Sequence, residues 1–244
     1  MSRERIYALD LIRGVAVLGM ILHHTLFAVE EVSALFGAPV SFAFFLDSRL
    51  FWVLQELFVG AFLLVSGICT AFSRSVLRRG LIVSAAAAAV TLATGILLPL
   101  LGLEGLEIWF GILHLFGLSM LLYGLFTFPK RIVPALTAVV LFALYLSMML
   151  TRGSGWSNAL CAVIGLPAKG FFSADYYPLL PYFLLFLAGT FLGRPVKERR
   201  LPAWFYTLRA RPIEWVGRHS LWIYLIHQPV IFGVAALVFW LICR

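Results

Sequence analysis

Long apolar stretches separated by short polar segments dominate the hydrophobic pattern of this chain. Seven stretches are long enough to span a bilayer as helices, which takes about 20 residues each: residues 6–29, 50–72, 81–101, 108–128, 132–150, 177–193 and 221–242. Residues 156–166 are apolar but too short to span, as in an interfacial or re-entrant piece. The pattern predicts an all-α, polytopic membrane helix bundle of about seven transmembrane helices, with residues 1–244 forming a single domain.

The composition agrees with a membrane protein and excludes an ordinary soluble domain. Hydrophobic residues make up 62% of the chain and charged residues 12%, whereas soluble domains carry about 25% charged residues. The net charge of +8 comes from basic residues in the short segments between apolar stretches. We therefore expect lipid as a partner and no nucleic acid. A homodimer is among the possible assemblies. The cysteine and histidine spacing predicts no metal site.

The distribution of Lys and Arg indicates the orientation of the bundle. With a cytoplasmic N-terminus, 14 of the 19 basic residues fall on the cytoplasmic side, as the positive-inside rule requires, and the C-terminus lies outside. The four outside are Arg49, Arg152, Lys169 and Arg244, while Arg13 lies within the first helix. The cytoplasmic set is Arg3, Arg5, Arg74, Arg78, Arg79, Lys130, Arg131, Arg194, Lys197, Arg199, Arg200, Arg209, Arg211 and Arg218.

The cytoplasmic segment 194–218 is basic and also carries aromatic residues. One interpretation is an orientation anchor on anionic lipid. The other is that some of these cations meet the phosphates of a cytoplasmic cofactor.

The first apolar stretch carries four ionisable side chains, Asp10, Arg13, His23 and His24. Ionisable groups in a spanning helix are costly and usually face the bundle interior. At about 100° per residue, Asp10, Arg13 and His24 share one face with Gly14, Val17 and Ile21, whereas His23 points away. Arg13 and His24 are then about 16 Å apart along the helix axis. This face is typical of a polar path through the bilayer.

Three further stretches carry polar candidates. In the second, Glu56 shares a face with Gly60, Leu63 and Gly67, and it either snorkels to the outer interface or pairs with His24. In the fourth, His114 fits an interhelical hydrogen-bonding group as well as a catalyst. In the last, Ser220, Tyr224 and His227 form one stripe, either as packing contacts or as the lining of a cavity shared with the first helix.

Five sequence blocks resemble the heparan-alpha-glucosaminide N-acetyltransferase catalytic-domain family, in that family's order. They are residues 5–24, 62–68 (Phe-Leu-Leu-Val-Ser-Gly-Ile), 111–119 (Gly-Ile-Leu-His-Leu-Phe-Gly-Leu-Ser), 175–181 (Asp-Tyr-Tyr-Pro-Leu-Leu-Pro) and 217–229. The opening helix is also similar to that of acyltransferase-3 proteins, which likewise carries an Arg and a His.

The resemblance implies a multipass enzyme of a bacterial-type cell membrane that takes acetyl from cytoplasmic acetyl-CoA. The acceptor is an amine or hydroxyl on the other face, expected to belong to a sugar, because lysosomal members acetylate a terminal glucosamine amine. Their active-site histidine lies in the loop after the opening helix. Here residues 29–49 contain no histidine, so His24 is the nearest candidate.

The residues can be given roles in acetyl transfer. His24 would be the base, oriented by Glu56, and Tyr224 or Ser220 would stabilise the oxyanion. Arg13, oriented by Asp10, would bind the donor, with Arg78 and Ser220 as further donor-binding candidates. Direct transfer in a ternary complex is favoured over an acetyl-histidine intermediate. Other candidate site residues are His23, His114, Asp175, His219 and His227.

Two other function classes fit part of the pattern. A carrier or channel for a small polar solute or a proton would use the same histidines and carboxylates as relay groups. The absence of an evident inverted repeat in the sequence and the five family blocks favour the enzyme. A non-catalytic helix-packing subunit is the third hypothesis.

Overall fold

The computed structural model describes residues 5–100, 102–126, 134–150 and 159–244. Over these residues the secondary structure is entirely helical, in agreement with the predicted all-α class. The chain divides into two compact units, Met1–Phe62 with Pro202–Arg244, and Leu63–Leu201. The predicted single domain remains a prediction. Four residues used to predict the orientation lie outside the described residues: Arg3, Lys130, Arg131 and Arg152. The start of segment 156–166 also lies outside them.

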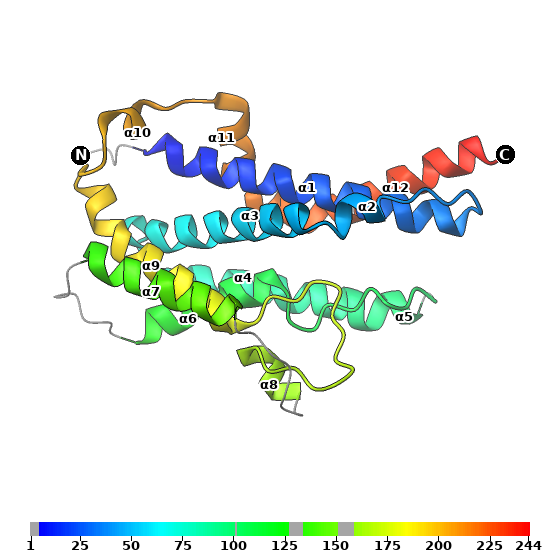
Figure 1. Ribbon diagram of the computed structural model, residues 1–244, viewed down its shortest axis with the longest axis horizontal. Helices are drawn as coiled ribbons and strands as arrows, with labels where there is room; N and C mark the ends of the chain where they lie inside the picture. Colours follow the sequence, from blue (N-terminus) through cyan, green and yellow to red (C-terminus); the bar gives the residue numbers. More distant parts are fainter. Residues whose placement is uncertain (1–4, 101, 127–133, 151–158) are drawn as a thin grey trace. The chain divides into compact units, whose positions relative to one another are not determined.

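The first unit is built on two long parallel helices, α1 (Tyr7–Leu35) and α12 (Ser220–Ile242). Two contacts fix the direction: His24 meets His227, and further along the Phe36 and Phe239 rings stack with centroids 6.5 Å apart. Figure 1 shows these helices side by side. The N-terminal ends of both helices therefore lie together, and the C-terminus lies at the other end of this unit.

The remaining helices of the first unit are shorter or shared. The first part of α3 (Arg49–Ile68) runs antiparallel to α1, because Phe51 contacts His23 while Phe58 lies against Gly19. Between α1 and α3, the chain forms the single turn α2 (Ala43–Leu46). Helices α10 (Ala203–Thr207) and α11 (Arg211–Arg218) precede α12.

A glycine contact fixes α11 against the beginning of α1. A side chain on Gly217 would collide with the backbone carbonyl of Asp10, and one on Gly14 would collide with the carbonyl of Ile213. Only residues without a Cβ allow two helix backbones to come this close. The contact places α11 directly beside Asp10 and Arg13.

The second unit contains the end of α3, the 3-10 turn η1 (Cys69–Phe72) and, among its described residues, seven further helical segments. These are α4 (Val76–Leu92), the π-helical turn η2 (Ala93–Leu97), α5 (Leu98–Leu100), α6 (Ile112–Leu125), α7 (Pro134–Leu150), α8 (Ala159–Ile164) and α9 (Leu179–Lys197).

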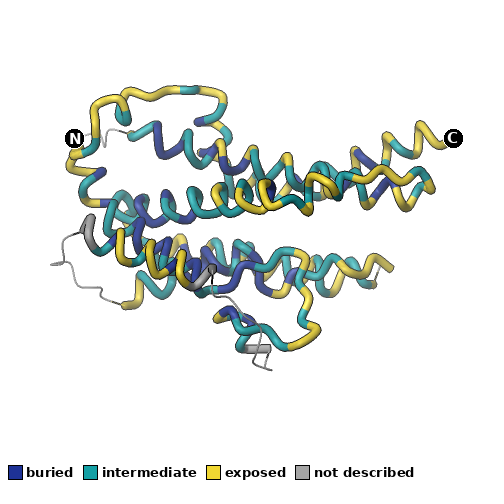
Figure 2. Tube along the Cα trace, viewed as in Figure 1, coloured by how far each residue is buried: buried dark blue, intermediate teal, exposed yellow. Residues whose placement is uncertain are grey.

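Small residues set the helix directions in this unit. Gly67 on α3 packs on Gly189 of α9, and Gly193 then meets Ile68 and Ala71, so α3 and α9 run parallel. Gly124 of α6 packs on Leu77 of α4, whereas Gly117 packs on Ser84, so α4 and α6 are antiparallel. Figure 2 shows how strongly α9 is buried, in contrast to the exposed C-terminal part of α12.

Five of the seven predicted spans are confirmed as helices long and apolar enough to cross a membrane. Within the described residues these are Tyr7–Leu35, Arg49–Phe72, Val76–Leu100, Leu179–Lys197 and Ser220–Ile242. Helices α6 and α7 are also apolar but shorter, so seven crossings are not established. The fourth span was predicted to begin at Ile108, but α6 begins at Ile112. The preceding residues instead pair with a distant segment, as Ala174 N donates to Glu107 O and Tyr177 N donates to Phe110 O.

Candidate functional site

At the beginning of α1, the buried carboxylate of Asp10 forms ion pairs with two guanidinium groups. Arg5 Nε lies 2.6 Å from Asp10 Oδ2, and Arg13 Nη2 lies 3.4 Å from Asp10 Oδ1. Arg13 Nη1 also donates to the carbonyl of Gly217 at 3.5 Å. The hydrogen bond to Asp10 raises the pKa of Arg5. The ion pair between Asp10 and Arg13 lies within α1. The hydrogen bond from Arg13 to the Gly217 carbonyl ties α1 to α11.

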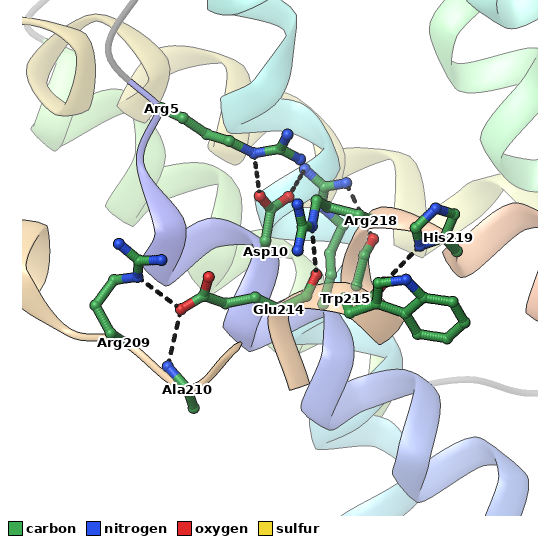
Figure 3. A network of polar contacts seen from close by, with 10 residues as sticks. Arg5, Asp10, Arg209, Ala210, Glu214, Trp215, Arg218 and His219 are labelled. Atoms are coloured by element: carbon green, nitrogen blue, oxygen red, sulfur yellow. Dashed lines mark hydrogen bonds and ion pairs between the residues drawn. The ribbon is translucent and has the colours of Figure 1, made fainter. Parts of the chain in front are cut away.

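A second buried carboxylate, Glu214, lies on α11 in the same part of the unit (Figure 3). Its Oε1 accepts hydrogen bonds from Arg209 Nε at 3.0 Å and from the backbone N–H of Ala210 at 2.8 Å. Burial opposes ionisation of this carboxyl, but the hydrogen bonds from Arg209 and Ala210 outweigh it, so the pKa of Glu214 is lowered. Arg209 also lies 3.5 Å above the centroid of the Tyr7 ring.

The two carboxylates are surrounded by more cations than they can neutralise. Arg5 and Arg13 pair with Asp10, Arg209 pairs with Glu214, and Arg218 Nε donates to the backbone carbonyl of Glu214. Four guanidinium groups against two carboxylates leave an excess of positive charge, and the side chains of Arg5 and Arg209 are about half exposed, at 50% and 44%. Such a cluster is chemically suited to phosphate groups. We use the name arginine cluster for six residues: Arg5, Asp10, Arg13, Arg209, Glu214 and Arg218.

Glu214 was missed by the sequence reasoning, which read segment 194–218 only as basic and aromatic. The available signal was an acidic residue in the first turn of a short helix that starts at Arg211-Pro212, because proline favours a helix start and acids favour its first turn. That its side chain is buried could not be read from this signal.

Farther along α1, three histidines come together in what we call the histidine cluster. His24 Nδ1 lies 2.7 Å from His227 Nε2 on α12, and His227 Nδ1 lies 2.6 Å from the Tyr224 carbonyl oxygen. His23 stacks on His24 with ring centroids 5.1 Å apart, and it also makes an edge contact with the Phe51 ring. His227 is 7% exposed, so the link between α1 and α12 is buried.

Arg13 of the arginine cluster and His24 of the histidine cluster lie on one stripe of α1, as the helical spacing predicted. Arg13 contacts Gly217 and His24 contacts His227, so both side chains face the C-terminal helices of the same unit. The 11 residues between them correspond to about 16 Å along the axis. The guanidinium group of Arg13 and the imidazole of His24 are thus separated along the axis of α1.

The other candidates of the first unit lie at different distances from the histidine cluster. The Tyr224 ring lies 5.5 Å from the His227 ring, centroid to centroid. Glu56 is partly buried on α3, and its pairing with His24 stays a prediction. Ser220 is the first residue of α12, about one turn before Tyr224. His219 is exposed, packs on Trp215 and has its Nδ1 2.9 Å from the Trp215 carbonyl, at the α11 end.

In the second unit, His114 and Asp175 each accept a backbone hydrogen bond at the start of α6. Asp175 Oδ2 accepts from the Ile112 N–H at 2.9 Å, and His114 Nδ1 accepts from the Gly111 N–H at 3.2 Å. The other ring nitrogen of His114 lies 3.0 Å from Thr91 Oγ1, so both nitrogens are engaged. This geometry favours the structural interpretation of His114. The last donor-binding candidate, Arg78, is exposed in the first turn of α4.

No three His, Cys, Asp or Glu side chains within the described ranges are grouped so as to hold a metal ion.

Comparison with known proteins identifies the family. The model of the family described as "Heparan-alpha-glucosaminide N-acetyltransferase, catalytic" matches residues 5–229. No curated protein and no solved structure matches the chain. The match begins at Arg5 of the arginine cluster and ends two residues after His227 of the histidine cluster. Since the match covers most of the sequence, the chain belongs to the heparan-alpha-glucosaminide N-acetyltransferase catalytic family, as an integral membrane protein of the acyltransferase class.

Proposed function

We propose that this protein transfers an acetyl group from cytoplasmic acetyl-CoA to an amine or hydroxyl of a sugar on the opposite face of the membrane. The observation that carries the proposal is the separation of two clusters along α1, with the arginine cluster where α1 meets α11 and the histidine cluster where α1 meets α12. The first is suited to the charged end of the donor, and the second to the proton transfer of the reaction.

For the donor, we assign the coenzyme A phosphates to the end of the unit that holds the arginine cluster. Arg13 is the principal residue, because it faces α11 and is held by Asp10. The uncharged pantetheine arm would then extend along α1 towards His24. Ser220 at the start of α12, and Arg78 in a cytoplasmic segment of the second unit, are the additional donor-binding candidates.

For the reaction, we assign His24 as the general base. As the acceptor nitrogen or oxygen attacks the thioester carbonyl, His24 takes its proton. The carbonyl carbon–sulfur bond then breaks, the acetyl group stays on the acceptor, and the proton passes to the coenzyme A thiolate. Glu56 would orient His24, and the Tyr224 hydroxyl would donate to the developing oxyanion.

The helix directions support transfer across the membrane. In the first unit, α1 and α12 run parallel, so the start of α1 and the end of α12 lie at opposite ends of that unit. The excess of cytoplasmic Lys and Arg assigns the N-terminal end to the cytoplasm. The arginine cluster would then face the acetyl-CoA pool.

Calorimetric titration of the purified protein with coenzyme A, followed by a thiol-release assay with acetyl-CoA and glucosamine, tests this function. We expect binding and acceptor-dependent release of free thiol. Arg13→Ala should abolish binding while the protein stays folded, whereas Arg194→Ala, an exposed arginine paired with Glu198, should bind normally. Unchanged affinity in Arg13→Ala would remove Arg13 from the donor site. Solute flux into liposomes without any thiol release would favour a carrier.

A further inference from the structure

His227 is a buried histidine whose two ring nitrogens have partners of different kinds. Its Nδ1 lies 2.6 Å from the backbone carbonyl oxygen of Tyr224, and its Nε2 lies 2.7 Å from Nδ1 of His24. A carbonyl oxygen can only accept a hydrogen bond, so Nδ1 of His227 must carry a hydrogen. The backbone of α12 therefore determines the tautomer of this ring.

The tautomer of His227 in turn determines that of His24. A charged imidazole within an apolar span is costly unless it is paired, so both rings are taken as neutral. Neutral His227 with its hydrogen on Nδ1 offers only a lone pair at Nε2. The hydrogen between the two rings must then belong to Nδ1 of His24, which donates to His227.

Nε2 of His24 is the ring nitrogen that remains available to accept a proton. With its hydrogen on Nδ1, His24 carries a lone pair on Nε2. Nowhere in the described residues does Nε2 of His24 have a hydrogen-bond partner. The contacts of His24 with His23 are made by the ring faces and do not engage this nitrogen.

We propose that His227 is a positioning residue that holds His24 in its Nδ1–H tautomer, so that Nε2 of His24 is the atom that receives the proton of the acceptor. The second part of this statement rests on the proposed function, whereas the tautomer does not. Free imidazole side chains favour a hydrogen on Nε2, so the hydrogen bond to His227 would reverse the intrinsic preference. A partner at one ring nitrogen commonly sets the state of the other in this way.

Two substitutions separate the hydrogen bond from simple packing. In His227→Gln, the side-chain amide oxygen can still accept from Nδ1 of His24. His227→Phe keeps a ring of similar size but removes the acceptor. His23→Phe is the matched control, because it keeps a ring stacked on His24 and leaves the bond to His227 in place.

Nitrogen NMR of the histidine-labelled protein in detergent at neutral pH reads the tautomers directly. The chain has five histidines, so a His24→Gln sample assigns the resonances of His24. We expect Nδ1–H in the wild type, in His227→Gln and in His23→Phe, and Nε2–H in His227→Phe. Detection of Nε2–H in the wild type would overturn the proposal, even if His227→Phe does not fold. An unchanged tautomer in a folded His227→Phe protein would overturn it as well.

Kinetics then test the consequence for acetyl transfer. His227→Phe should lower kcat by about 10–100-fold, the range typical of lost supporting contacts, with little change in KM for acetyl-CoA. His227→Gln should recover most of this loss. Equal losses in both variants would contradict the positioning role. If the NMR result is as expected but the wild type transfers no acetyl group, the tautomer assignment stands and the proposed function fails.

Discussion

At the scale of single residues, adjacent histidines have different surroundings. His24 hydrogen-bonds across to α12, whereas the ring contacts of His23 are stacking on His24 and an edge contact with Phe51. Their side chains leave the helix about 100° apart, so a single helix cannot present both to the same neighbour. This difference leads to opposite expectations for the two residues.

We predict that His24→Ala lowers acetyl transfer by about 10²–10⁴-fold, the usual loss for a general base, while coenzyme A still binds. His23→Ala should cost far less, through lost packing against Phe51. Steady-state rates of the two variants, with titrations of coenzyme A, provide the measurement. An inactive His23→Ala with an active His24→Ala would show that the opposite face of α1 is used. Full activity in both would move the base to His227 or His114.

At the scale of elements, the position of α11 depends on two glycines. Gly217 leaves no space for a Cβ against the backbone of Asp10, and Gly14 leaves none against Ile213. Because the carbonyl of Gly217 also accepts from Arg13, the same crossing that joins the helices also holds the arginine cluster.

We predict that Gly217→Ala destabilises the protein by about 1–3 kcal/mol, the usual cost of overpacking, and weakens coenzyme A binding. Gly233→Ala is the control, because a Cβ there meets open space on α12. Thermal unfolding in detergent should show a melting temperature lower by several degrees for Gly217→Ala only. An equal melting temperature for the two variants would mean that α11 can move away from α1 with little loss of stability.

Glu214, the buried carboxylate of α11, makes the stability of the fold depend on pH. Hydrogen bonds from Arg209 and Ala210 lower the pKa of Glu214 below its ordinary value of 4.5 despite the opposing effect of burial. Because the pKa of Glu214 is lower in the folded state than in the unfolded state, the ionised carboxylate stabilises the fold at pH values above 4.5. This stabilisation is lost as the pH falls through the folded-state pKa.

We predict that the melting temperature of the wild type falls as the pH is lowered below about 4.5, the ordinary value for this carboxyl. Glu214→Gln should be less stable at neutral pH and lose less stability on acidification. Glu198→Gln is the comparison, since that exposed carboxylate pairs with exposed arginines, and such pairs contribute little. Parallel pH curves for wild type and Glu214→Gln would contradict this role of Glu214.

At the scale of the whole molecule, the asymmetric distribution of basic residues predicts the topology. The segment around Arg79 and residues 194–218 should face the cytoplasm, and residues 104–107 the opposite side. Single cysteines introduced at these positions, in a chain whose three native cysteines are replaced, can be labelled in intact cells. An impermeant reagent should modify the 104–107 site alone, and modification at position 79 from outside would reverse the orientation.

The sequence by itself determined the helical membrane class, because apolar stretches of spanning length have few other stable states. It also placed Asp10, Arg13 and His24 on one face, since helical periodicity is a local property. The family could also be recognised from the sequence, because its motifs are short stretches of neighbouring residues.

Only the tertiary structure decided which residues meet across helices. The contacts of His24 with His227, of Gly217 with Asp10, and of Asp175 with the start of α6 join residues 63 or more positions apart. No periodic pattern encodes such pairs. The length of α6 was also decided there, because residues 107–110 pair with a distant segment instead of continuing the helix. The buried state of Glu214 likewise depends on how α11 packs against α1, since the residue lies in an otherwise basic segment.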